Sequence, residues 1–270
     1  MQANSNTLPQ RQPDGTLELV NDEAFIVVKA APRRSETLGE TVCCAGLDRS
    51  GDWVRLYPVS FRQLDDAQKF GRWDRVKYRW SKPKAAKDTR SESRRVDPNS
   101  IEIVGQLKSA DRNAALTRSL VTSLKKEREA NRSLALLSVE VLDFWHQRHS
   151  DDELERRDKI LTTLRAQDDL FAAAAVPART CPYSFHYRYR DDDGVHEGTC
   201  QDWETEHTYF RRLKDQGSEA AALAWMKHKF GQEYPEKGMA LAMGTHRYRA
   251  DQWLINGIIR VNPSTQSVLL

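Results

Sequence analysis

The sequence lacks any long hydrophobic run. No stretch approaches the roughly 18 consecutive apolar residues that a membrane-spanning helix needs. The N-terminal segment MQANSNTLPQRQPDG also has no apolar core of the kind found in secretory signals. This segment shows no periodic pattern, so residues 1–20 are predicted to form a flexible tail. These absences predict a cytoplasmic protein without membrane contact.

Cysteine is scarce, and its spacing argues against a metal site. Cys43 and Cys44 are adjacent, so on a strand they would point to opposite faces. Cys181 and Cys200 lie near two histidines, but the spacing matches no standard zinc motif. The sequence predicts no metal and no cofactor.

Common catalytic motifs are also missing: there is no Gly-rich phosphate loop, no GxSxG elbow and no HExxH pair. The segment with Asp202, Glu204 and His207 still raises the enzyme question, because Glu and His three residues apart on a helix share a face and can ligate a metal. The favoured interpretation is structural, with Asp202 and Glu204 at a helix N-terminus where carboxylates are favourable. A binding protein is the leading class, and a metal-assisted hydrolase centred on these three residues is the alternative.

The chain has enough hydrophobic residues to form a folded core, and its other residues are highly polar. Of its 270 residues, 39% are hydrophobic and 30% are charged, and the mean hydropathy is −0.72. This composition is typical of globular proteins, and the length allows one large domain or two small ones. We expect two.

Positive charge is concentrated in residues 72–95. This window holds ten Lys and Arg residues against three acids, a net charge of +7, whereas the whole chain carries only +3 and the remainder therefore −4. Such a local excess makes a directed field that suits a polyanion. The cations are Arg72, Arg75, Lys77, Arg79, Lys82, Lys84, Lys87, Arg90, Arg94 and Arg95.

Aromatic residues are interspersed with these cations. Flat rings beside Lys and Arg are what binders of single-stranded nucleic acid use to stack bases, but aromatics are also common core residues of strands. The period of two places Tyr78 and Trp80 opposite the cationic face of their strand, which leaves Trp53 or Trp73 as stacking candidates. The predicted binding residues are Trp53, Arg55, Trp73, Arg75, Lys77, Arg79, Lys82, Lys84, Lys87 and Arg90.

The first part of the chain has the pattern of a small barrel. Short β-branched or alternating runs predict strands at 24–30, 40–48, 52–59, 73–81 and 100–107. Five strands of this length with wide basic loops are typical of a Greek-key barrel such as an OB-fold.

The rest of the chain mixes helices and strands. Residues 111–180 are predicted to be a helical connector with helices at 111–131 and 151–175, although 134–147 reads as extended. In residues 181–270 the segment 183–190 is an amphipathic strand with four aromatics on one face. It is followed by helices at 203–215 and 218–231 and by strands at 239–244 and 253–261.

Two groups of segments together resemble a bacterial family of dual-OB-domain (DuOB-like) proteins. The N-terminal group is ETVCCAGLDRSGDWVRLYPVSFRQL with KDTRSES, and the C-terminal group is PYSFHYRYRDDDGVHEGTCQDWE with MALAMGTHRYRADQWLINGIIRV. The resemblance implies two consecutive OB-like barrels in poorly characterised accessory proteins, some linked to defence against mobile DNA. It also implies a His/Cys cluster before the DWE segment, of which this chain retains only His196 and Cys200.

The predicted fold is therefore β-rich α+β, with a first OB-like barrel at 21–110, a helical connector at 111–180 and a second OB-like domain with helical insertions at 181–270. The predicted function is non-catalytic binding of single-stranded DNA or RNA through the first barrel, without strong sequence preference. The second domain is predicted to contact a protein partner. A third hypothesis is an interaction scaffold whose basic loop docks on an acidic protein.

Overall fold

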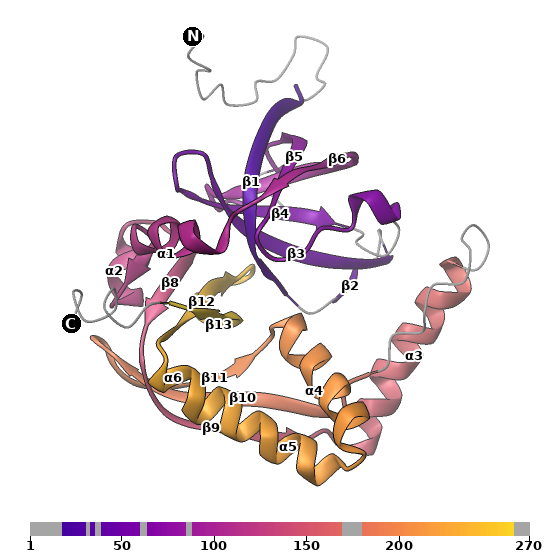
Figure 1. The fold of residues 1–270 in the computed structure, drawn as a ribbon. Coiled ribbons are helices and arrows are strands. Elements are labelled where there is room, and N and C mark those ends of the chain that lie inside the picture. The colour runs from indigo at the N-terminus through magenta and orange to yellow at the C-terminus, as the bar shows by residue number, and fades with distance from the viewer. Residues whose placement is uncertain are drawn as a thin grey trace.

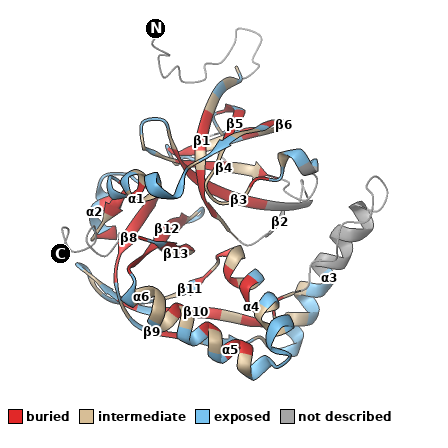
Figure 2. Ribbon diagram, in the orientation of Figure 1, coloured by how far each residue is buried: buried red, intermediate tan, exposed pale blue. Residues whose placement is uncertain are grey.

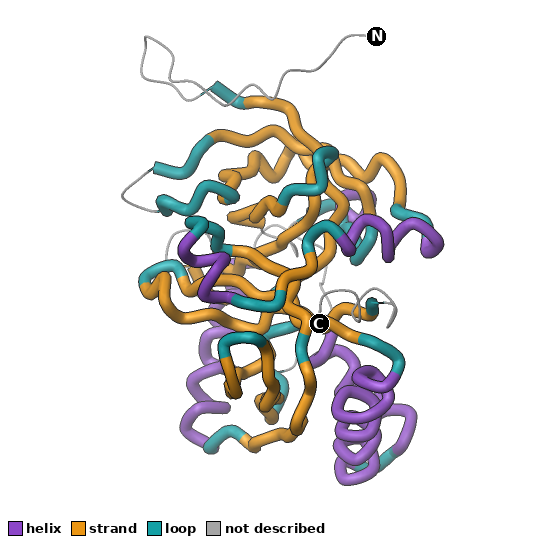
Figure 3. Tube along the Cα trace, turned by 90° about the vertical axis from the view of Figure 1, so that its left-hand side faces the viewer, coloured by secondary structure: helices purple, strands orange, loops and turns teal. Residues whose placement is uncertain are grey.

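The structure is a computed structural model, and it describes residues 18–261 except 31–32, 36–38, 60–63, 85–87 and 169–179. The described residues form a β-rich α+β fold with a barrel in the N-terminal part and a second sheet with helices in the C-terminal part (Figure 1). In the view of Figure 3 the strands of the barrel form the upper part of the molecule, and the second sheet with most of the helices forms the lower part. The predicted tail falls on residues 1–17, which lie outside the described residues, and on the start of the first strand.

Five strands close the barrel. Strand β1 pairs with both β5 and β3, so the order β1-β5-β6-β4-β3 returns to its beginning, and the short β2 extends the edge of β3. Four of the neighbouring pairs are antiparallel, whereas β4 and β6 run parallel. The predicted strands are confirmed, although the last is longer than expected. The strands are β1 (Val20–Lys29), β2 (Arg33–Ser35), β3 (Gly39–Asp48), β4 (Trp53–Val59), β5 (Asp74–Ser81) and β6 (Ser93–Gln106).

The second sheet has seven strands in the order β7-β8-β12-β13-β11-β10-β9. Residues predicted as a helical connector supply three of them, so that prediction is not confirmed, whereas the extended interpretation of 134–147 is. Because β8 and β9 belong to this sheet, the C-terminal unit begins well before residue 181. The strands are β7 (Leu120–Val121), β8 (Leu134–Ser138), β9 (Glu140–Arg148), β10 (Tyr183–Asp191), β11 (Gly194–Cys200), β12 (Met239–His246) and β13 (Arg249–Arg260).

The helices lie around the second sheet. The helix predicted over 111–131 is broken, because Leu120 and Val121 pair with β8 and Ser123 caps a new helix by accepting a hydrogen bond from Lys126 N. The helices are α1 (Ser109–Thr117), α2 (Leu124–Glu129), α3 (Asp151–Asp168), α4 (Trp203–Gln216), α5 (Glu219–His228) and α6 (Tyr234–Glu236), with a 3₁₀ turn η2 (Asp66–Gln68) and a π-helical turn η3 (Lys229–Glu233). Among the described residues, none of the helices combines the length and apolarity needed to span a bilayer.

The core consists of three clusters of side chains. One fills the barrel and includes Ile26 and Tyr78. A second joins the outer face of β1 and β3 to β8, β12 and β13, and includes Val28 and Leu136. A third packs the other face of the second sheet on α4 and α5, and includes Met226. The clusters therefore cover both faces of the central strands, whose residues are largely buried and drawn in red in Figure 2.

This arrangement explains why several strands read as continuous apolar runs. Strand β1 is covered on both faces, since Ile26 faces the barrel interior while Val27 and Val28, beside a β-bulge, join the cluster between the two parts. The two parts approach closely there, because a Cβ atom at Gly257 of β13 would lie 3.1 Å from Val28 Cγ2. We call this middle cluster the interdomain core.

Replacing Gly46 with Ala should destabilise the barrel. Gly46 pairs with Ile26 across β1 and β3, and a Cβ atom there would lie 2.3 Å from the backbone oxygen of Phe25, which cannot move without opening the barrel. We expect a loss of about 1–3 kcal/mol or more in the free energy of unfolding, measured by urea denaturation. Gly71→Ala is the control, since its Cβ would meet only Asp74 Oδ2 at an ordinary 3.5 Å. Equal stability of the two variants would contradict this account of barrel closure.

Candidate nucleic-acid interface

Strand β4, which carries the predicted binding residues Trp53 and Arg55, lies under the second sheet. Arg55 is only 3% exposed. Its guanidinium donates hydrogen bonds to Ser93 Oγ at 3.3 Å, to Ser133 Oγ at 3.0 Å and to Ser133 O at 3.0 Å. Ser133 directly precedes β8, so this arginine joins the barrel to the second sheet. Arg55 is therefore not available to a ligand, and its predicted binding role is corrected to an internal one.

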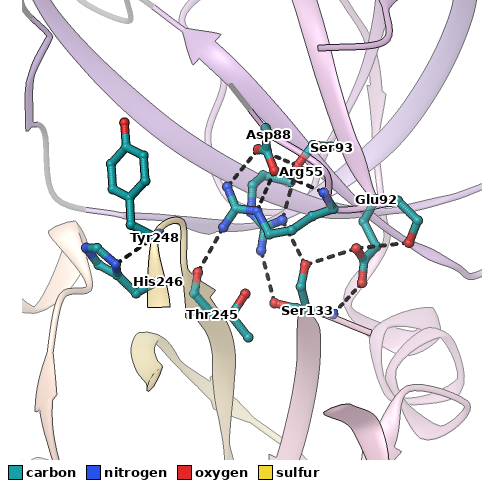
Figure 4. Close-up of polar contacts among 10 residues, drawn as sticks. Arg55, Asp88, Glu92, Ser93, Ser133, Thr245, His246 and Tyr248 are labelled. Carbon is teal, nitrogen blue, oxygen red and sulfur yellow. Dashed lines mark hydrogen bonds and ion pairs between the residues drawn. The ribbon is translucent and has the colours of Figure 1, made fainter. Parts of the chain in front are cut away.

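A buried carboxylate completes this contact. Glu92 accepts a hydrogen bond from the backbone N–H of Ser133 at 2.6 Å and another from its hydroxyl at 2.9 Å. Desolvation lowers the pKa of Arg55, and the carboxylates of Glu92 and Asp88 oppose that shift. The buried charges are thus compensated within a shared set of hydrogen bonds (Figure 4).

Arg90 makes a second connection between the two parts. Asp88 holds its guanidinium through two hydrogen bonds of 2.8 Å, and its Nη1 donates to Thr245 O at the end of β12 at 2.9 Å. Burial alone would raise the pKa of Asp88, but the hydrogen bonds and charge of Arg90 outweigh it and lower the pKa to about 2. We refer to Arg55, Asp88, Arg90, Glu92, Ser93, Ser133 and Thr245 as the Arg55 cluster.

The segment with Asp202 and Glu204, which is the alternative hydrolytic site, forms another contact between the barrel and the second sheet. Asp202 is 3% exposed, caps α4 by accepting from Glu204 N at 3.1 Å, and also accepts from Ile258 N at 3.3 Å. Arg72 of the barrel reaches across to Asp202 and Glu204, each at 3.2 Å, and donates to Ile258 O at 2.8 Å. Burial raises the pKa of Asp202, although the positive charge of Arg72 opposes this. The interpretation of this segment as a helix N-terminus is confirmed.

His207, the third residue of this segment, has an aromatic contact. It packs edge-on against Trp203, with ring centroids 5.3 Å apart. Among the residues that the structure describes, no group of three or more His, Cys, Asp or Glu is arranged to hold a metal ion.

Both predicted stacking rings pack against the interdomain core. Trp53 and Trp73 are partly buried on it. Trp73 adopts a left-handed backbone (φ 75°) held by hydrogen bonds to Ile26 O and from Leu107 N, and the Arg112 guanidinium lies 4.9 Å from its ring centre. Both rings are therefore partly covered, and their role in stacking stays a prediction.

The cations of β5 are exposed as expected but face acids. Arg79 forms an ion pair with Asp97 at 2.7 Å, and Arg75 lies 3.6 Å from Glu23. Lys77 is directly opposite Glu23 on one neighbouring strand and Glu102 on the other. Hydrogen bonding from Arg49 and the nearby charges lower the pKa of Glu23, so it remains a carboxylate beside them. This face carries little unbalanced positive charge.

The lysines of the loop between β5 and β6 differ from the cations of β5 in how their charge is balanced. Lys82 and Lys84 are exposed, and within the described part of the chain neither has an ion-pair partner. Lys87 lies outside the described residues. The loop is anchored at its end, because Asp88 N donates to Lys84 O at 3.1 Å and Asp88 holds Arg90.

The structure adds a segment that the charge pattern did not identify. The turn between β12 and β13 carries the exposed residues Arg247, Tyr248 and Arg249, and it follows Thr245, the residue that accepts from Arg90. In Figure 4 Tyr248 and His246 lie beside the Arg55 cluster. The polar run HRYRAD between two apolar strands signals an exposed hairpin tip, but only the fold brings it to the basic loop.

Comparison with known protein families gives two matches. A family model described as Domain of unknown function (DUF8757) matches residues 114–270, more than half of the chain. The chain belongs to the DUF8757 family. A second model, described as Domain of unknown function (DUF8758), matches residues 20–123, which include the barrel. The DUF8757 segment includes all seven strands of the second sheet. No curated protein matches the chain.

Asp88→Asn should make the protein less stable than the wild type at neutral pH and equally stable in strong acid. A carboxyl whose folded pKa is lowered contributes stability that is present above its ordinary value of 3.8 and is lost as the pH falls towards about 2. We expect the difference in melting temperature between wild type and variant to be constant from pH 7 to pH 5 and to close between about pH 4 and pH 2.

Asp251→Asn, which changes an exposed carboxylate on the β12–β13 hairpin, is the matched control and should show no such closing difference. A difference for Asp88→Asn that is independent of pH would show that its charge does not stabilise the Arg55 cluster.

Proposed function

We propose that the protein binds single-stranded nucleic acid, without strong sequence preference, at the loop between β5 and β6. The observation that carries this proposal is that some of the basic residues have a carboxylate partner and others do not. Arg72, Arg75, Arg79 and Arg90 have carboxylate partners, whereas Lys82 and Lys84 are exposed without one among the described residues. Unbalanced lysines on an anchored loop are suited to phosphates.

The barrel supports this choice of ligand. We propose that it is OB-like, because it is a closed five-stranded barrel in which strands distant in sequence pair. OB-folds bind single strands with the face of their second and third strands and with the loops after the first and fourth strands. Since β2 only extends an edge, the loop between β5 and β6 follows the fourth barrel strand.

The usual OB ligand face is covered in this protein. The second and third barrel strands are β3 and β4, and four of their outward residues, Ala45, Leu47, Trp53 and Arg55, pack on the second sheet or bond to it. A strand of nucleic acid could reach that face only if the two parts separated. We therefore assign binding to the loop at the margin of this interface.

Contacts of this kind give affinity without base readout. Lysine side chains neutralise phosphates, which are the same at every nucleotide, and so carry no sequence information. Binding that depends on a few such contacts weakens as salt rises, with a slope of about −0.7 in log K against log salt for each phosphate contact on a single strand.

Reversing the charge of the loop should abolish most of the binding. We expect the wild type to bind a fluorescein-labelled dT or rU oligonucleotide in fluorescence anisotropy at about 50 mM salt and to lose affinity steeply by about 200 mM. Lys82→Glu combined with Lys84→Glu should lower the affinity roughly tenfold or more and flatten the salt dependence.

The matched control is Lys214→Glu combined with Lys227→Glu, which makes the same change in charge at exposed positions of α4 and α5. It should bind nearly as well as the wild type. No binding by the wild type at 50 mM salt would refute the proposal. If polyglutamate displaces the oligonucleotide at equal charge concentration, the loop recognises an acidic protein instead.

A further inference from the structure

The hairpin between β12 and β13 presents the most exposed large hydrophobic side chain among the described residues. Tyr248 is 78% exposed. The guanidinium of Arg247 lies 4.9 Å from the centre of its ring, and Arg249 is exposed in the same turn. An aromatic ring flanked by arginines is the combination that stacks a base while neutralising the adjoining phosphates.

The position of this hairpin is fixed relative to the basic loop. Thr245 accepts from Arg90 through its carbonyl oxygen at 2.9 Å, and its own N–H donates to Ser133 O at 3.0 Å. Arg90 is held by Asp88, and Asp88 bonds to the backbone of Lys84. A short series of hydrogen bonds thus links the backbone of Lys84 in the barrel to the hairpin of the second sheet.

The turn itself also orients the ring. Tyr248 N donates to Nδ1 of His246 at 3.2 Å, and the two rings lie 6.1 Å apart. Figure 4 shows Tyr248 directed away from the hydrogen-bonded cluster. The ring is therefore presented at the margin of the Arg55 cluster without being packed into it.

We infer that Tyr248 is the base-stacking residue of a composite site for single-stranded nucleic acid, in which Lys82 and Lys84 of the barrel and Arg247 and Arg249 of the hairpin contact phosphates. This inference rests on the proposed function and assigns part of the site to the second sheet. Arg90 and Asp88 are positioning residues, since they hold the loop and the hairpin together. Stacking tolerates any base, which agrees with binding that is not sequence-specific.

The test compares two probes and two substitutions at Tyr248. Binding of labelled dT12 and of a 12-unit abasic deoxyribose-phosphate strand is measured by fluorescence anisotropy at about 50 mM salt. Tyr248→Ala should weaken binding of dT12 about 5- to 100-fold and leave binding of the abasic strand unchanged, because the latter has phosphates but no bases. Tyr248→Phe should retain binding of dT12, since the ring is preserved.

Leu142→Ala, which removes another exposed apolar side chain on β9, is the control and should leave both affinities unchanged. If Tyr248→Ala binds dT12 as well as the wild type while the Lys82 and Lys84 double variant does not, the stacking inference is wrong and the proposed function stands. Equal losses for dT12 and the abasic strand would also overturn it. If the wild type binds neither probe, the proposed function itself fails.

Discussion

The packing of the barrel against the second sheet is the constraint on which the rest of the structure depends. Apolar residues of β1, β3, β8, β12 and β13 form the interdomain core, and polar contacts flank it, with Arg72 on Asp202 and Arg55 on Ser133. Each guanidinium is largely removed from water and hydrogen-bonded across the interface, so separating the two parts would expose apolar surface and leave buried polar groups without partners. The barrel and the second sheet therefore act as one body.

This packing decides what the positive segment can do. Two of its arginines, Arg72 and Arg90, reach into the second part and serve the interface, and those of β5 are balanced by acids on neighbouring strands. What remains is a smaller positive surface at the loop between β5 and β6. Because the same interface brings the β12–β13 hairpin to this loop, the proposed site belongs to both parts. A protein partner for the second sheet remains a prediction.

Local patterns predicted much of the fold but not the pairing of its surfaces. Alternation placed Tyr78 and Trp80 opposite the cations of their strand and the aromatics of β10, from Tyr183 to Tyr189, on one face, and all of these rings are buried. Arg55 was predicted to bind a ligand, and nothing local shows that Ser133 would instead accept its hydrogen bonds. The role of Arg90 likewise depends on Thr245, 155 residues away. Contacts between distant segments carry no periodic signal.

The most direct test of the composite site is hydrogen–deuterium exchange of the protein with and without dT12. The account predicts added protection in two separate segments, residues 82–90 and 246–249, at the same oligonucleotide concentration, and none on α4 and α5. Protection of the loop alone would remove the second sheet from the site. Protection on the outer faces of β3 and β4, or loss of protection across the interdomain core, would contradict the claim that the two parts act as one body.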